Sequence, residues 1–208
     1  MMIITIGRQY GSGGREIGEK VAQRLGYKFY DSEILTIAAE NSGYSEGAMS
    51  QYDEKPSSSL IYSLYMSSTS SINTVDLLPT NQKLAFAQFD AIRALAREDN
   101  VVFVGRCADY VLRERKDLVS VFIHASEENR RRRAVDSYGV PKEAVDKVLK
   151  KQDKQRREYY NFFTHRDWGA AVNYHLCARS DYLGIDGTVD LIAAFTATRQ
   201  DLLKSGNV

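Results

Sequence analysis

A strand, a glycine-dense turn and a helix follow one another at the start of this chain. Residues 2–6 are apolar enough for a buried strand, and an amphipathic helix is predicted from about Gly14 to about Leu25. Between them, successive glycines let backbone N–H groups converge on an anion, and the helix N-terminus adds the positive end of its dipole. The segment therefore predicts a cradle for a phosphorylated ligand. A tightly packed turn that binds nothing is the alternative.

The turn departs from the usual phosphate-loop pattern, G-x-x-x-x-G-K-[ST]. Its residues are, in order, Gly11, Ser12, Gly13, Gly14, Arg15 and Glu16. The position of the lysine holds Gly14, and no Ser or Thr hydroxyl follows to hold magnesium. We expect an arginine to supply the missing charge, with a planar fork in place of a point charge. Arg15 is the first candidate and Arg8 the second.

Length and composition limit the class of protein. With 208 residues and a hydrophobic content of 43%, the chain fits one domain with an ordinary core. The net charge of +1 gives no argument for nucleic acid or an anionic membrane as a partner, and a homo-oligomer is left open. Cys107 and Cys177 lack motif spacing and suit a reducing cytoplasm, where we expect the protein. We see no secretory leader and no apolar run that would span a bilayer.

Strand and helix patterns alternate along the rest of the chain. Further strands are predicted at 27–30, 101–104, 118–123 and 174–178, and helices at about 32–41, 81–97, 127–136, 142–160 and 188–204. The central strands are apolar without alternation, as in strands covered on both faces. The predicted fold class is therefore α/β, a parallel β-sheet wrapped by helices, with ligands at the carboxyl ends of the strands.

Residues 43–80 differ in character from the rest. Serine-rich runs at 57–59 and 67–71 and prolines at 56 and 79 punctuate the stretch. We predict a flexible insertion with one or two short helices that closes over a substrate, because long irregular segments in compact domains often have a function. A surface excursion without a function is the alternative.

Two polar side chains follow directly after predicted strands. Asp31 ends the strand at 27–30, where it can accept hydrogen bonds from a substrate or cap the next helix. Arg106 follows Gly105 and the strand at 101–104. Its fork can bind a phosphate in bidentate fashion or pair with a helix carboxylate. The three histidines have no metal-ligand spacing, so no protein-bound metal centre is predicted.

Arginines crowd the predicted helix at 127–136. Arg130 and Arg133 are three positions apart and share a face, which suits the clamping of transferring phosphates. For Arg131 and Arg132 we favour a solvated face. The predicted helix at 142–160 carries a second group of charged residues, again with two arginines.

That second group consists of Asp153, Arg156 and Arg157. The spacings of three and four place the aspartate on a face with either arginine. One interpretation is a pair of lid arginines held by Asp153. The other is an intrahelical ion pair that contributes only ~0.3 kcal/mol.

Together these pieces resemble the cytidylate kinase-like family of P-loop kinases. The segments that carry the resemblance are 4–17, 30–32, 104–106, 122–133, 153–160 and 168–185, and the similarity extends over nearly the whole chain. The resemblance implies one P-loop kinase-like domain over 1–208, with an acceptor-side insertion at 43–80 and an arginine-rich lid region at 126–160. It also implies ATP and Mg²⁺ as cofactors and a nucleoside monophosphate such as CMP as acceptor. The alternatives are a non-catalytic nucleotide-binding module with a degenerate phosphate loop, and a kinase of another small metabolite.

The resemblance also implies roles for individual residues. Nucleotide-binding residues would be Arg8, Gly11, Ser12, Gly13, Gly14, Arg15, Glu16, Arg130 and Arg133. Acceptor-binding residues would be Asp31, Arg106 and Asp153, and catalytic residues Arg15, Arg130, Arg156 and Arg157. The chain departs from the family pattern at Gly14 and Glu16, and at Val104, where cytidylate kinases proper have an aspartate. We expect Glu16 to take part in magnesium binding through water.

Overall fold

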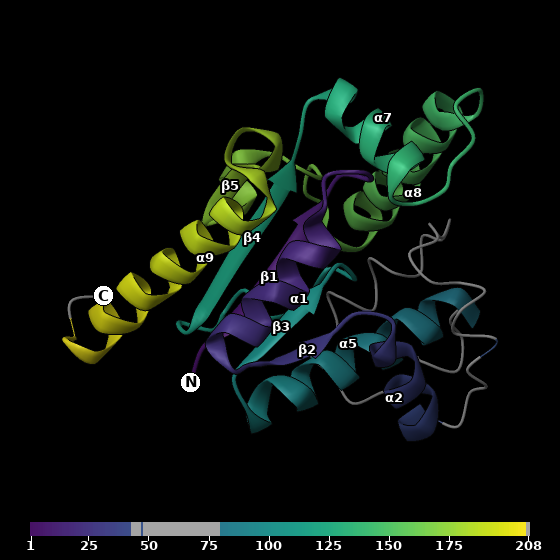
Figure 1. Ribbon diagram of the computed structural model, residues 1–208. Helices are drawn as coiled ribbons and strands as arrows, with labels where there is room; N and C mark the ends of the chain where they lie inside the picture. Colours follow the sequence, from purple (N-terminus) through teal and green to yellow (C-terminus); the bar gives the residue numbers. More distant parts are fainter. Residues whose placement is uncertain (43–46, 48–79, 207–208) are drawn as a thin grey trace.

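The structure is a computed structural model that describes residues 1–42, 47 and 80–206 (Figure 1). Nearly all of the predicted insertion at 43–80 lies outside the described residues. Among the described helices, none has the length and apolar character needed to cross a membrane.

Five parallel strands form the centre of the molecule in the order β2-β3-β1-β4-β5. They are β1 (Ile3–Arg8), β2 (Lys28–Tyr30), β3 (Val101–Val104), β4 (Leu118–His124) and β5 (Leu176–Arg179). Strand β1 lies between β3 and β4, with Ile3 in register with Val101 on one side and Leu118 on the other. The predicted α/β fold with a parallel sheet is confirmed.

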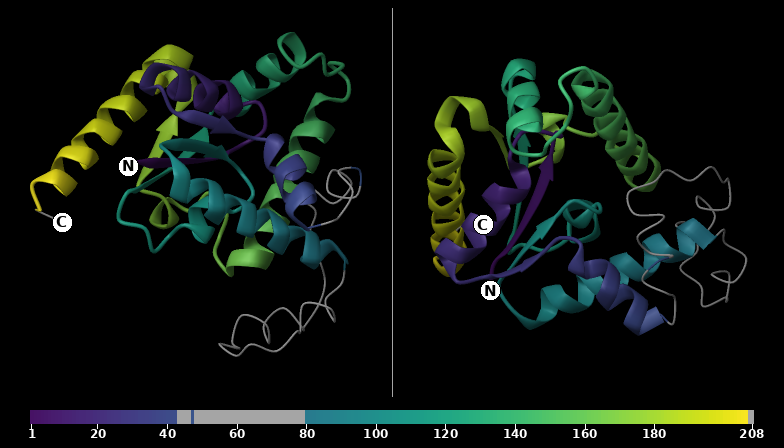
Figure 2. Two further views of the ribbon diagram at one scale, coloured as in Figure 1. Left: turned by 90° about the horizontal axis from the view of Figure 1, so that it is seen from below. Right: turned by 45° about the vertical axis from the view of Figure 1, so that its right-hand side comes forward.

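Helices cover both faces of this sheet. They are α1 (Gly14–Leu25), α2 (Glu33–Ser42), α5 (Thr80–Glu98), α6 (Ala108–Val111), α7 (Glu127–Asp136), α8 (Val145–Thr164) and α9 (Ser180–Lys204), with a 3₁₀ turn, η2, at Ala171–Asn173. One face carries α1 and α9, and the other carries α5 and part of α8 (Figure 2). Helix α7 and the start of α8 project beyond the end of the sheet (Figure 1).

Side-chain alternation along β1 explains why isoleucines occupy both sides of its first part, residues 3–6. Ile4 and Ile6 point to one face and pack in a cluster with Ile17 of α1 and Ile192 of α9. Ile3 points to the opposite face and joins a cluster with residues of α2 and α5. Burial on both faces removes the polar positions that a half-exposed strand would show.

Three helices differ most from the sequence prediction. Helix α8 begins at Val145 and ends at Thr164, later at both ends than predicted. Helix α9 begins at Ser180, because a helical turn precedes a break at Gly184 (φ 72°, ψ 172°) that hides it from the helical pattern. Helix α6 was not predicted at all. It follows Arg106 and Cys107, which have left-handed φ angles of 53° and 55°. Neither residue is glycine, so the sequence does not indicate this conformation.

Candidate functional site

The glycine turn lies at the carboxyl edge of the sheet. It connects the end of β1 to α1, beside the ends of β3 and β4, where ligands of open α/β sheets bind. Helix α1 begins at Gly14, and the preceding residue Gly13 (φ 78°) has no side chain to cap it. The N–H groups of residues 13–16 therefore have no partner within the helix and point out of its end. The turn thus has the form of an anion site.

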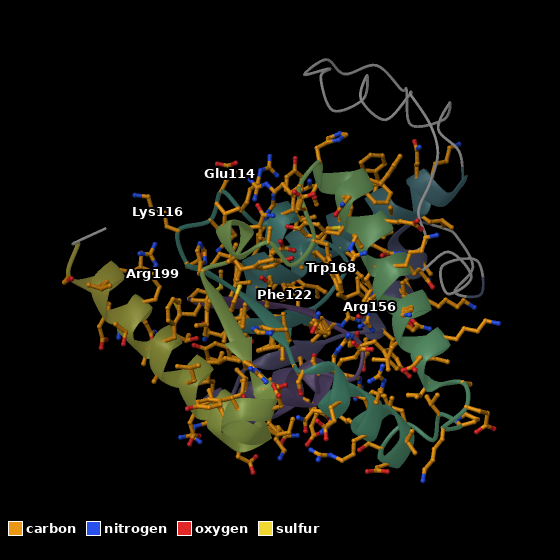
Figure 3. All side chains as sticks on the ribbon, turned by 90° about the horizontal axis from the view of Figure 1, so that it is seen from above. Glu114, Lys116, Phe122, Arg156, Trp168 and Arg199 are labelled. Atoms are coloured by element: carbon orange, nitrogen blue, oxygen red, sulfur yellow. The ribbon has the colours of Figure 1, made fainter. Side chains whose placement is uncertain are left out.

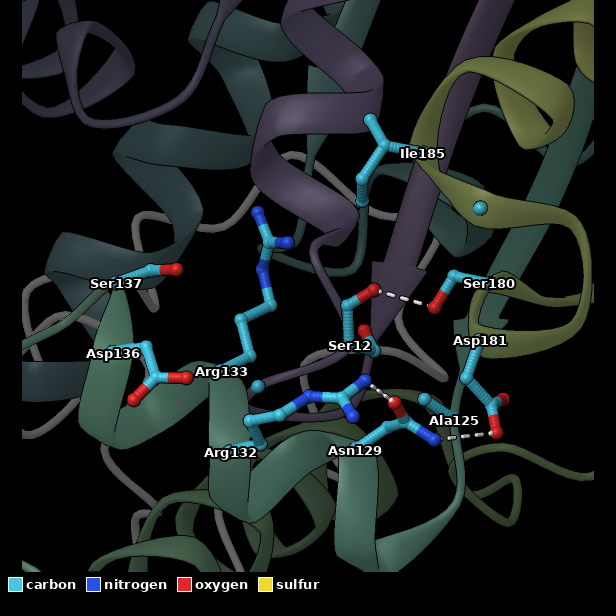
Figure 4. A pocket seen from close by; sticks show the side chains of 12 residues that line it. Ser12, Ala125, Asn129, Arg132, Arg133, Asp136, Ser137, Ser180, Asp181 and Ile185 are labelled. Atoms are coloured by element: carbon cyan, nitrogen blue, oxygen red, sulfur yellow. Dashed lines mark hydrogen bonds between the residues drawn. The ribbon is translucent and has the colours of Figure 1, made fainter.

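The turn is held rigidly in place. The buried Ser12 donates from its hydroxyl to the carbonyl of Gln9 over 2.8 Å. Its own carbonyl accepts a hydrogen bond of 2.7 Å from the hydroxyl of Ser180 (Figure 4). A Cβ on Gly11 would come within 2.7 Å of the Arg130 carbonyl oxygen, so α7 packs directly on the turn. Larger residues at this position would push the two segments apart.

An ion pair joins both lid-region helices to the turn. Asp153 of α8 accepts a hydrogen bond of 2.7 Å from the Tyr10 N–H and pairs through its second oxygen with Arg130 of α7. The same guanidinium donates to the Tyr10 carbonyl over 3.2 Å. Each partner's side chain is only 12% exposed. The Asp153 carboxylate, predicted to bind substrate, thus positions Arg130 and the turn, and its contact with substrate stays a prediction.

The other arginines of α7 divide between the site and the surface. Arg133 reaches across to Glu16, in the first turn of α1. Arg131 pairs at the surface with Glu127 and with Asp146 of α8. Arg132, for which we favoured a solvated face, is exposed but also lines a hollow beside the turn.

Arg156 and Arg157 are neighbours in sequence but lie on different sides of α8. Arg156 donates to the carbonyl of Arg8 over 3.3 Å and lies over the Tyr10 ring, facing the turn. Arg157 lies over the ring of Trp168, which packs edge-to-face on Phe122 (Figure 3). Of the two lid arginines predicted from the sequence, the structure brings Arg156 to the turn.

Asp31 joins two arginines on the opposite side of the turn. Arg106 is buried, with 3% of its side chain exposed, and its guanidinium lies 3.2 Å from Asp31. Arg15 lies 2.9 Å from the same carboxylate and 3.4 Å from Glu19, with 56% of its side chain exposed. Of the three predicted acceptor residues, Asp31 and Arg106 therefore lie together, whereas Asp153 lies apart with Arg130 and Tyr10. Arg15 belongs to the Asp31 group as much as to the turn.

Three hollows lie in a row along this edge. The largest, which we call the phosphate hollow, has about 500 Å³ and is lined by the turn, Arg8, Asp31, Arg133 and Arg156. The base hollow, of about 280 Å³, shares Gly11, Arg133 and Ser137 with it. The acceptor hollow, of about 20 Å³, shares Arg8 and Arg156 with it.

Sequence reasoning missed most of the base hollow. Its far wall is the start of α9 with Asp181 and Ile185, and its near wall includes Asn129, whose amide bridges Arg132 and Asp181 (Figure 4). A bidentate hydrogen bond from Arg179 holds the pKa of Asp181 well below its usual range. The one available signal was that these residues follow a predicted last strand, where ligands of parallel sheets bind.

The acceptor hollow holds a carboxyl that sequence reasoning also missed. Burial raises the pKa of Asp109 to about 6, against a hydrogen bond of 2.8 Å from the Tyr160 hydroxyl that lowers it. The positive charge of Arg166 also lowers the pKa of Asp109, and burial together with the Asp109 carboxylate raises the pKa of Tyr174. Within the parts of the chain that the structure describes, no cluster of His, Cys, Asp and Glu that could hold a metal ion was found.

Solved structures similar to this chain include an uncharacterized protein and two shikimate kinases. An uncharacterized protein from Eubacterium ventriosum ATCC 27560 is 26% identical, with a TM-score of 0.72 over 95% of this chain and 99% of that chain. The shikimate kinase of Bacteroides thetaiotaomicron is 13% identical, with a TM-score of 0.54 over 98% of both chains. That of Aquifex aeolicus is 16% identical, with a TM-score of 0.52 over 97% of this chain and 99% of that chain. The shikimate kinases share the fold alone.

The family comparison is more specific. No curated protein matches the sequence. The profile of the cytidylate kinase-like family matches residues 3–182, and these include the glycine turn, both arginine groups and the start of α9. Because this match spans most of the sequence, the chain belongs to the cytidylate kinase-like family, as predicted from its residues.

Proposed function

We propose that this protein transfers the γ-phosphoryl group of MgATP to a small acceptor, and that the acceptor is a nucleoside monophosphate such as CMP. The observation that carries the proposal is the order of the three hollows. The base and phosphate hollows share Arg133 of α7, and the phosphate and acceptor hollows share Arg8 and Arg156. A donor nucleotide laid along the base and phosphate hollows would end at these two arginines, on the side of Arg106.

The residues of the site suit a reaction that needs positioning and charge neutralisation rather than covalent catalysis. The N–H groups of the turn and of the N-terminus of α1 would bind the donor phosphates. The glycines of the turn are needed there, because a side chain at Gly11 would collide with Arg130 and one at Gly13 with Ile185. Arg156 would neutralise the transferring group, and Arg106 would orient the acceptor phosphate. Magnesium would arrive with the triphosphate and neutralise its charge, and Glu16 would hold it through water.

A coupled assay for ADP formation tests this function. We expect ATP turnover with a panel of nucleoside monophosphates to be fastest with CMP. Turnover only with a hydroxylated, unphosphorylated metabolite would overturn the proposed acceptor. ATP binding without ADP formation with any acceptor would overturn the transfer itself and favour a non-catalytic nucleotide-binding module, the function favoured by the glycine at the lysine position.

The substitution Arg106→Lys tests the acceptor side. It keeps the charge but removes the fork that binds a phosphate in bidentate fashion. We expect the KM for the acceptor to rise at least tenfold, about 1.4 kcal/mol, while the KM for ATP changes less. Arg93→Lys, an exposed position on α5, is the matched control. A larger effect on ATP than on the acceptor would contradict this assignment.

A further inference from the structure

The glycine turn has exchanged two residues relative to the phosphate-loop pattern. In G-x-x-x-x-G-K-[ST], the first glycine stands five positions before the second, and the lysine directly after it. With Gly13 as the second glycine, the first glycine position is Arg8 and the lysine position is Gly14. A cation and a glycine have therefore changed places across the loop.

The structure gives a physical reason for the exchange. A Cβ on Gly14 would lie 2.4 Å from Cβ of Arg8 and 2.9 Å from its Cγ, closer than carbon atoms can pack. The backbone at Gly14 does not require glycine, because this residue begins α1 and lacks the positive φ of Gly11 and Gly13. Gly14 is therefore glycine because the stem of Arg8 lies over it. The arginine side chain occupies the space in which a lysine at position 14 would begin.

The surroundings direct Arg8 toward the phosphate hollow. The hydrogen bond from Gln9 N–H to the Ile123 carbonyl (3.0 Å) holds the following peptide, and Arg156 donates to the Arg8 carbonyl. The Arg8 side chain lines both the phosphate and the acceptor hollow. Arg15, in contrast, is held by Asp31 and Glu19 at the exposed side of α1. Of the two candidates, Arg8 lies at the junction of donor and acceptor.

We propose that Arg8 supplies the positive charge that a phosphate loop ordinarily takes from its lysine, and that Gly14 is its obligatory partner. The proposal rests on the proposed function, in which a nucleoside triphosphate occupies the phosphate hollow. A guanidinium stays charged at any physiological pH and offers two parallel donors to phosphate oxygens. The exchange therefore preserves the charge but moves its origin from the first residue of α1 to the last residue of β1.

Substitutions at both positions test the exchange, with MgATP binding by calorimetry and phosphoryl transfer as readouts. Arg8→Met keeps a stem over Gly14 without the charge, and we expect at least a tenfold loss of affinity or turnover. Gly14→Lys alone should lose as much, because the new stem collides with Arg8. The double variant Arg8→Gly/Gly14→Lys restores the first glycine and the lysine of the usual pattern and should recover most of the loss. Arg15→Ala, at the other candidate position, should lower MgATP affinity less than Arg8→Met does. Arg93→Lys, at an exposed position on α5, should leave both readouts unchanged.

The results separate this proposal from the function on which it rests. If the wild-type protein binds no triphosphate, both fail. If the wild-type protein binds MgATP and Arg8→Met has the same affinity and turnover, only the role of Arg8 is overturned. The same holds if Arg15→Ala causes a larger loss than Arg8→Met. A double variant no better than the worse single variant, at an unchanged melting temperature, would likewise overturn the exchange. Should the double variant not fold, the comparison of Arg8→Met with Arg15→Ala decides.

Discussion

Single residues in this site acquire their roles from neighbours that are distant in the sequence. The carboxylate of Asp31 lies between Arg106, 75 positions later, and Arg15, on the first turn of α1. Arg15 is thus engaged by Asp31, whereas Arg8 lies over Gly14 at the end of β1. This difference in partners is why we assign the charge of the missing lysine to Arg8 and not to Arg15.

Asp109 offers a test of electrostatics at this scale. Its pKa is about 6 in the folded protein and about 3.8 in a solvated carboxyl, because burial penalises the charged form. Because the pKa is higher in the folded than in the unfolded state, the contribution of this carboxyl to the free energy of unfolding is fully present below about pH 4. That contribution is lost as the pH rises to about 6. The wild-type protein should therefore lose roughly 3 kcal/mol of unfolding free energy over this range relative to Asp109→Asn.

Denaturant unfolding at pH 4, 5, 6 and 7 measures this difference. The variant keeps an acceptor for the Tyr160 hydroxyl, so the pH-dependent part of the curve isolates ionisation. Asp90→Asn, on the exposed side of α5, should run parallel to the wild type. If the Asp109→Asn curve also ran parallel, the carboxyl would titrate normally in the folded state.

The sequence predicted which residues stand at strand ends, but not which residues form hydrogen bonds or ion pairs with one another. The positions of Asp31 and Arg106 after strands predicted that they would meet, since parallel strands end at one edge. The spacing of Asp153 and Arg156 predicted a partner within one helix. The Asp153 carboxylate instead accepts a hydrogen bond from the N–H of Tyr10, 143 positions away. No periodicity in the sequence indicates a contact at that separation. The exchange of Arg8 and Gly14 likewise depends on an interatomic distance.

Elements differ in how far their boundaries follow from sequence. Helix α1 runs from Gly14 to Leu25 as predicted, because glycine ends it at both sides and its apolar face is regular. Helix α9 begins eight residues before its prediction, because the break at Gly184 divides its pattern. Boundaries set by local periodicity were predictable, and those set by left-handed backbone or tertiary packing were not.

Two ion pairs connect α7 to α8, and they should contribute unequally to stability. Arg130 and Asp153 are both 12% exposed, whereas Arg131 and Asp146 are 43% and 57% exposed. Asp153→Ala leaves a buried guanidinium without its carboxylate, which should cost about 3–5 kcal/mol of unfolding free energy. Asp146→Ala, the matched control, should cost about 1 kcal/mol or less.

Urea unfolding of both variants gives the comparison. Equal losses would mean that the buried pair does not hold the helices to the glycine turn. A second readout, hydrogen exchange in α7 and α8, should show faster opening for Asp153→Ala than for Asp146→Ala, because only the buried pair also bonds the backbone of Tyr10.

At the scale of the whole molecule, the site is assembled from segments spread over the chain. The base and phosphate hollows are lined by the glycine turn, by α7 and its following loop, and by the start of α9. These segments lie on both sides of β1, and they meet because the parallel strands all end at one edge (Figure 1). A ligand that spans the hollows would therefore contact parts of the fold that follow three different strands.

This arrangement predicts a rise in melting temperature with MgATP. At 100 times its dissociation constant, a ligand that binds only the folded state adds about 2.7 kcal/mol, which is about 5–10 °C for a domain of this size. Adenosine, which lacks phosphates, should give a much smaller rise at the same concentration. Arg133→Ala, which removes a side chain lining both hollows, should diminish the MgATP shift, whereas Arg157→Ala, which lines neither, should preserve it. A shift of equal size in the two variants would mean that the nucleotide binds elsewhere on the molecule.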